Sequence, residues 1–169
     1  MSWSRVWSRA NNPDAYVVQV GFGGFDQGYG AALLSDGTLL SWGNSTMVAG
    51  HADPGTTMVV ADHVVELAPN FYGVSYLRRS DSPTATGHEL WGYGPANYAL
   101  GNGREPVLVD TDVISFQSGM GFNFWMRLAE DGSFDGVYGR GYNAQGAVGL
   151  NSSGTPQTGE STRRLIQFP

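Results

Sequence analysis

The run from Ala31 to Gly43, AALLSDGTLLSWG, consists of two apolar segments joined by an Asp-Gly turn and closed by an aromatic-Gly pair. Asp-Gly between apolar segments is a strong β-hairpin signal, because glycine accepts the positive φ that a tight turn requires. The pattern returns in residues 124–139, and again in residues 76–92 with a longer connection at residues 80–87. The sequence therefore predicts three hairpins of one type.

An apolar strand precedes each hairpin at a regular distance. VVQV at residues 17–20 returns as VVEL at 64–67, VISF at 113–116 and LIQF at 165–168, at separations of 47, 49 and 52 residues. A period of about fifty residues is typical of repeat architectures. We therefore predict an N-terminal arm and one repeat domain, with the following bounds: arm 1–16, domain 17–169, units 17–63, 64–112 and 113–164, and the start of a fourth unit at 165–168.

The second half of each unit carries a more specific pattern. An aromatic-Gly pair (Trp42-Gly43, Trp91-Gly92, Tyr138-Gly139) is followed by Asn and a Gly-rich turn in residues 44–50, 97–103 and 143–149. Residues 17–168 thereby resemble the repeats of the regulator of chromosome condensation family. The resemblance implies an all-β fold of three antiparallel, propeller-like blades. The three aromatic residues are expected to fill the wedges between neighbouring blades.

Three blades leave an apolar face at each end of the arc, and such faces are costly to expose to water. Head-to-tail association of identical chains covers both faces, because a heterologous interface whose rotation closes gives a ring. We therefore expect a homo-oligomer, with six blades in a dimer or nine in a trimer. Residues 165–168 either close the last blade of their own chain or donate a strand to a neighbour, and the sequence leaves both open.

Composition excludes several function classes. The chain has no Cys, so thiolate chemistry and Cys-ligated metals are excluded, and its net charge of −6 with no Lys disfavours general nucleic-acid binding. The three histidines (His51, His63, His88) lack metal-site spacing, so we predict no metal site, no cofactor and no catalytic residue. No apolar run is long enough for a signal peptide or a membrane span, so we expect a soluble protein made in a cytoplasm.

The arm carries the residues predicted to bind a partner. If the segment is extended, one face carries Trp3, Arg5, Trp7 and Arg9, and if it is helical, Trp3 and Trp7 stack one turn apart. Trp and Arg are enriched at binding hot spots, so we expect these four side chains to dock on another protein chain. The alternative is that the segment is a strand that completes the first blade or caps its open end.

Three function classes follow from these observations. The first is a non-enzymatic binding module of a bacteriophage virion, such as a tail, fibre or capsid-attached protein, with the virion as its location and a host-surface receptor as a further partner. The second, implied by the family resemblance, is a cytoplasmic regulatory protein-binding module of the guanine-exchange-factor type, for which residues 80–87 form the only unusual hairpin. The third is a carbohydrate-active enzyme, which requires two carboxylates ~5–9.5 Å apart in a cleft.

Overall fold

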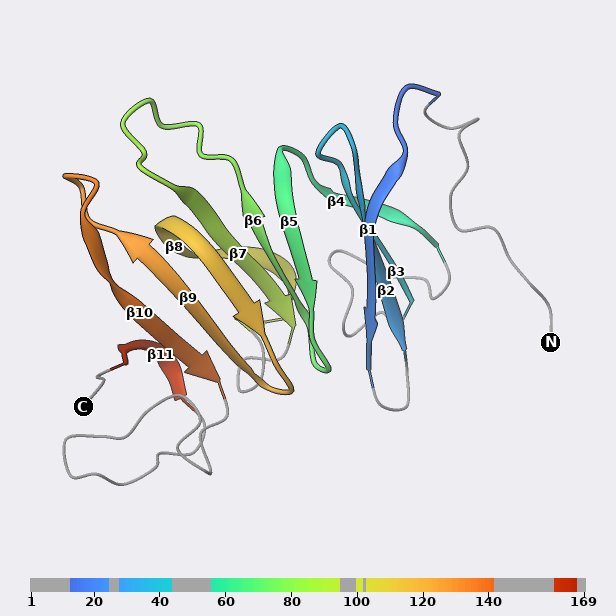
Figure 1. Ribbon diagram of the computed structural model, residues 1–169. Coiled ribbons are helices and arrows are strands. Elements are labelled where there is room, and N and C mark those ends of the chain that lie inside the picture. The colour runs from blue at the N-terminus through green and yellow to red at the C-terminus, as the bar shows by residue number, and fades with distance from the viewer. Residues whose placement is uncertain are drawn as a thin grey trace.

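A computed structural model of the chain describes residues 13–24, 28–43, 56–94, 100–101, 103–141 and 160–166. Every regular element in these ranges is a strand, every pairing is antiparallel, and the strands fan out side by side (Figure 1). The all-β class predicted from the sequence is therefore confirmed. The described residues include no helix that is long and apolar enough to span a membrane.

The first blade is a four-stranded sheet in sequence order. It comprises β1 (Val17–Gly23), β2 (Tyr29–Leu34), β3 (Leu39–Gly43) and β4 (Met58–Ala61). The predicted Asp-Gly turn joins β2 to β3: Gly37 has φ +87°, and the Asp36 carboxylate accepts the Thr38 backbone N–H at 3.0 Å. An aspartate that bonds the backbone two residues on stabilises such a turn, which explains the hairpin at this point.

The second and third blades form one seven-stranded sheet, because they share a strand. Its members in chain order are β5 (Val64–Pro69), β6 (Val74–Arg78), β7 (His88–Gly94), β8 (Gly103–Ser118), β9 (Phe122–Leu128), β10 (Phe134–Gly141) and β11 (Glu160–Leu165). The first half of β8 pairs with β7 and the second half with β9, and β8 curves between the two blades (Figure 1). Asp112 has φ +56° within β8, and His63 has the same φ where β4 passes into β5. Each blade therefore leads into the next through one left-handed residue.

Apolar cores fill both spaces between the blades. Between the first and second blades lie Tyr29, Ala31, Leu33, Leu39, Val64, Leu67, Val74, Tyr76 and Tyr93, and between the second and third lie Leu77, Leu90, Leu100, Val113, Phe116 and Trp125. Trp91 packs against the first core and Tyr138 against the second, as predicted for wedge residues. Trp42 instead packs on a cluster on the far side of the first blade, because no earlier blade lies there in the described part of the chain.

Polar contacts also join the first two blades. The Gln19 side-chain amide donates to the Leu67 carbonyl at 2.5 Å and accepts the Leu67 N–H at 3.0 Å, so it bonds the inner strand of the next blade as a neighbouring strand would. The Tyr29 hydroxyl lies against the carbonyl oxygens of Asn70 and Gly73 in the β5–β6 turn. Because these partners are fixed by strand pairing, the two sheets are held in one register.

The end of the chain bears on an alternative that the sequence left open. Leu165 pairs with Tyr138 in β10, and the Ile166 N–H donates to the Val137 carbonyl at 2.8 Å. These two residues therefore pair with the third blade of their own chain, which is the first of the two alternatives. Residues 167–168 lie outside the described residues.

Candidate functional site

In each blade, strand pairing aligns three residues directly across the three inner strands, ending at the aromatic residue of the aromatic-Gly pair, and we call these three residues a row. The rows are Phe22–Gly30–Trp42 in the first blade, Leu67–Tyr76–Trp91 in the second and Phe116–Trp125–Tyr138 in the third. We call the face of each blade that carries this row its front face, and the opposite face its back face. In the second and third blades the front face packs against the back face of the preceding blade.

The front face of the first blade is exposed along its edge strands β1 and β4, whereas Ala32, Leu34 and Leu40 on its central strands are buried. Phe22 is 86% exposed, whereas Leu67 and Phe116, at the equivalent places in the other rows, are each 1% exposed. Val20 and Val59 on the same face are 68% and 64% exposed. Large apolar side chains gathered on one exposed face are typical of a surface that binds another protein. This face is our candidate functional site.

Local packing explains the flat shape of this face. Gly30 occupies the place held by Tyr76 and Trp125 in the other rows, and the Trp42 indole lies directly over it: a Cβ on Gly30 would come within 2.2 Å of the ring. Trp42 is thus held flat against the sheet, with Ala15, Ala32, Leu34 and Leu40 buried beside it. The result is an apolar platform from which Phe22 and Val20 project.

The predicted binding residues of the arm, Trp3, Arg5, Trp7 and Arg9, lie outside the described residues. The structure does show where the arm meets the repeat domain. Ala15 is buried in the cluster on the front face of the first blade. The arm therefore joins the domain at the open face.

At the other end of the arc, the back face of the third blade is also apolar. Phe124, Met126 and Val137 surround a shallow groove with a volume of about 90 Å³. Met126 is 37% exposed. Equivalent positions on the back face of the second blade, such as Leu77 and Leu90, are buried under the third blade. The two ends of the arc are therefore opposite halves of one kind of interface.

The long connection between β6 and β7 is the second distinctive feature. It projects beyond the other hairpins (Figure 1), as the sequence predicts. Thr86 fixes it to the third blade by donating its backbone N–H (2.9 Å) and hydroxyl (3.0 Å) to the Asp112 carboxylate. The backbone N–H of Thr86 holds the pKa of Asp112 below its usual value. A polar hollow of about 540 Å³ lies beside the connection, lined by Ser80, Ser82, Thr84, Ala85, Glu89, Thr111, Asp112 and Glu130.

Carboxylates collect at this hairpin end, where most of them are neutralised or solvated. Arg78 bonds Glu89 at 3.2 Å and Asp81 at 3.0 Å. Asp131 accepts from Ser133 within its turn, and Asp135 lies 3.2 Å from Arg127. Carboxylates engaged in this way suit a structural role better than acid-base catalysis.

The histidines remain scattered in the structure. His63 is exposed at the bend between β4 and β5, 3.8 Å from Asp81, and His88 begins β7. His51 lies outside the described residues. Within the described ranges, no three His, Asp or Glu side chains are grouped so that they could hold a metal ion.

Comparisons with known proteins bear on the fold. No protein-family model matches the chain, and no curated protein matches it in sequence. Among solved structures, Prp20p from Saccharomyces cerevisiae aligns with a TM-score of 0.63 at 18% identity, covering 93% of this chain and 38% of Prp20p. Human WBSCR16 aligns with a TM-score of 0.57 at 18% identity, covering 90% of this chain and 38% of that protein. The chain thus spans well under half the length of either neighbour.

These likenesses confirm a fold like that of the regulator of chromosome condensation. They do not bear on a bacteriophage origin. The Prp20p structure is described together with its binding to Gsp1p and to histones, so that neighbour binds other proteins.

Sequence reasoning missed Phe22 as a site residue. It lies just beyond residues 17–20, the only part of this strand that the repeat pattern singled out. The available signal was the alternation of Val18, Val20 and Phe22 along one strand, since alternate residues share a face. Their exposure depends on which blades neighbour the strand, and a repeat pattern does not specify that.

Proposed function

We propose that this chain is a regulatory protein-binding module that presents open propeller blade faces to other protein chains and performs no chemistry of its own. The observation that carries the proposal is the front face of the first blade, where Phe22 is 86% exposed at a position buried in the other two blades. The likeness to Prp20p, which binds Gsp1p and histones, supports protein binding as the function. Nothing in the comparisons supports a virion component, so of the functions predicted from the sequence the regulatory alternative is the better supported.

For the front face of the first blade, we propose a second copy of this chain as one occupant. Within the chain, the front faces of the second and third blades pack against the apolar back faces of the first and second blades. The back face of the third blade is apolar in the same way. Placing Phe22 of one copy near Phe124 and Met126 of the next repeats that internal arrangement. Continuity with an existing interface favours this docking mode over an unrelated one. Two or three copies joined in this way would form a ring.

We predict that Phe22→Ser weakens self-association by about 10–100-fold, because burying a Phe side chain contributes about 1.5–3 kcal/mol and every 1.4 kcal/mol is tenfold in affinity. Light scattering across a concentration series of the purified chain measures this. Phe134→Ser is the matched control: Phe134 is 61% exposed, at the start of β10 near the hairpin end. A chain that stays monomeric at every concentration would rule out the second copy as the occupant.

The arm is tested in the same assay. Deleting residues 1–10 is expected to weaken assembly and leave the strand content unchanged, because Trp3, Arg5, Trp7 and Arg9 dock on another chain in this proposal. Circular dichroism follows the strand content. If the truncated chain assembles normally but melts at a much lower temperature, the arm is an internal strand of the first blade.

Binding to a different protein is tested separately. The exchange-factor form of this function rests on the projecting residues 80–87, which Thr86 holds in place. It requires that the chain accelerate nucleotide release from a small GTPase, for which Gsp1p is the first probe. Unchanged release rates at saturating concentrations of the chain would exclude the exchange-factor form, but not protein binding through the first blade.

A further inference from the structure

Arg140 lies at the end of β10 that is remote from the hairpin turns. It is directly opposite Asn123 of β9, which in turn is opposite Ser118 of β8. Alternation along β10 puts Arg140 on the same face as Tyr138, which is the front face of the third blade. Arg140 and Asn123 are therefore neighbours at the boundary between the second and third blades.

The guanidinium of Arg140 is a partly buried cation without a partner among the described residues. Its Nε atom is fully buried and has no acceptor. Burial lowers the pKa of this guanidinium, and no carboxylate of the described side chains offsets that effect. Arginine stays charged in proteins, and burying a charge without a counter-charge is costly. A side chain in this state lacks an anionic partner.

Asn123 is held so that it offers a second free donor. The residue is 0% exposed, and its Oδ1 atom accepts from the Ser118 hydroxyl at 2.6 Å, the Ser75 hydroxyl at 3.3 Å and the Asn70 side-chain amide at 3.4 Å. The Asn70 amide identifies this atom as the oxygen: its own Oδ1 accepts the backbone N–H groups of Tyr72 and Gly73, so its NH₂ group must be the one that faces Asn123. The Nδ2 atom of Asn123 is then left buried with no acceptor. Buried polar groups are almost always bonded, so an unpaired one calls for an explanation.

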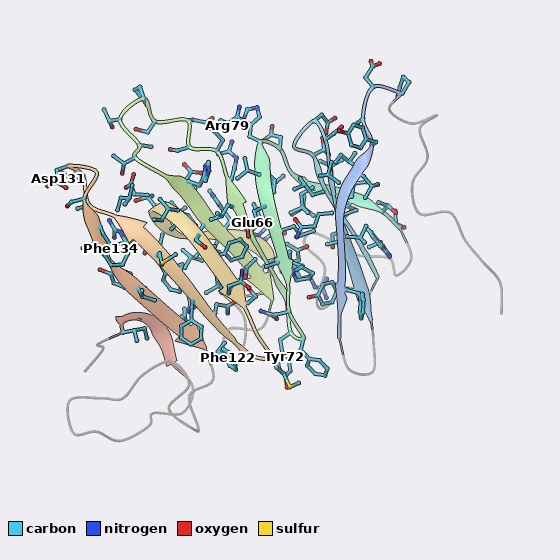
Figure 2. All side chains as sticks on the ribbon, viewed as in Figure 1. Glu66, Tyr72, Arg79, Phe122, Asp131 and Phe134 are labelled. Carbon is cyan, nitrogen blue, oxygen red and sulfur yellow. The ribbon has the colours of Figure 1, made fainter. Side chains whose placement is uncertain are left out.

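The surroundings favour an anion. Figure 2 shows Tyr72 and Phe122 at one end of the sheets and Arg79 and Asp131 at the other, where the carboxylates collect. Two of the turns at the first end, residues 70–73 beside Asn70 and 118–122 beside Ser118, contain no acidic residue. An anion that approaches Arg140 from this end meets less negative charge than it would at the hairpin end.

We propose that Arg140 and Asn123 form a binding site for a small oxyanion of the carboxylate or phosphate type, set between the second and third blades. Both side chains offer donors only, which selects a ligand that only accepts hydrogen bonds. The planar guanidinium fork matches two oxygens of a carboxylate or phosphate. The site is independent of the protein-binding face on the first blade.

Bound oxyanion is expected to stabilise the fold, since a ligand that binds only the native state raises the free energy of unfolding by RT ln(1 + L/Kd) at free ligand concentration L. The experiment follows melting temperature while sodium phosphate or sodium acetate replaces sodium chloride at constant ionic strength and pH. We compare the unaltered chain with Arg140→Gln, and use Arg79→Gln as the matched control because Arg79 is an exposed arginine at the opposite end.

In the unaltered chain and in Arg79→Gln, at least one of the two oxyanions is expected to raise the melting temperature with the logarithm of its concentration once that concentration exceeds the Kd. In Arg140→Gln the apparent affinity should fall at least tenfold. A response to phosphate alone identifies a tetrahedral oxyanion, and a response to both includes carboxylates. Equal responses in all three proteins, or none in any of them, would overturn the proposal.

A second measurement guards against a variant that does not fold. In the unaltered chain, the side-chain NH₂ resonances of Asn123 should shift saturably with the effective oxyanion, because Nδ2 donates to it. Arg140→Lys keeps the charge but loses the fork, and should bind more weakly with the same resonances shifting. Asn123 resonances that ignore every oxyanion while the melting temperature rises would also contradict the site.

Discussion

Trp125→Ala is expected to lower the free energy of unfolding by about 3–5 kcal/mol, the range for deleting a large buried aromatic side chain. Trp125 is 1% exposed in the core between the second and third blades, and its ring stacks on Tyr138 with centroids 6.2 Å apart. Its indole N–H also donates to the buried Asp110 carboxylate at 2.7 Å. The substitution therefore leaves a cavity and removes one hydrogen bond from a buried charge. Urea unfolding measures the loss.

Two further variants separate these contributions. Trp125→Phe keeps most of the ring but loses the bond to Asp110, and should cost about 1–3 kcal/mol. Phe134→Ala removes an aromatic that is 61% exposed and should cost less than about 0.5 kcal/mol. Equal losses for Trp125→Ala and Phe134→Ala would show that the space between these blades is not a packed core.

Gly43→Ala is expected to destabilise the first blade by about 2–5 kcal/mol, combining left-handed strain of about 1–2 kcal/mol with overpacking of about 1–3 kcal/mol. Gly43 has φ +115°. A Cβ there would come within 2.5 Å of the Gly28 carbonyl oxygen and 2.6 Å of the Tyr29 Cα. Both neighbours are backbone atoms of the paired segment, so neither can move aside cheaply. Thermal unfolding followed by circular dichroism measures the effect.

Gly103→Ala is the matched control for that substitution. Gly103 has φ +120°, and a Cβ there would meet nothing within 4 Å. The control carries the backbone strain without the crowding, so it should cost only about 1–2 kcal/mol. If the Gly43 variant melts at the same temperature as the Gly103 variant, then β2 and β3 are not closely packed where Gly43 faces Tyr29.

The repeat pattern predicted the blades because it records local chemistry. An Asp-Gly turn between apolar segments specifies a hairpin regardless of its surroundings, so the turns at Gly37 and Gly132 follow from the sequence alone. The sequence pattern predicts the packing between blades less well than it predicts the hairpins. Trp125 was assigned only to a hairpin strand, yet it is the largest buried side chain, because burial depends on which face meets the next blade.

The sites were harder to predict than the fold for the same reason. Phe22 and Leu67 occupy equivalent rows and differ only in whether a blade precedes them. Arg140 and Asn123 are 17 residues apart in the sequence, and their pairing follows from the register of β9 and β10. The arm was singled out because Trp and Arg repeat within it, a signal that requires no tertiary information.

The shared strand β8 has a consequence for how the chain opens. Hydrogen bonds on both halves of this 16-residue strand tie the second blade to the third, whereas the first blade is a separate sheet that ends at Ala61. Cooperative opening units often coincide with such continuously bonded pieces. Amide exchange would then divide into two classes, with β5 to β10 exchanging together and β1 to β4 exchanging sooner. The blade that carries the open face is thus also the one free to separate from the rest without breaking a sheet.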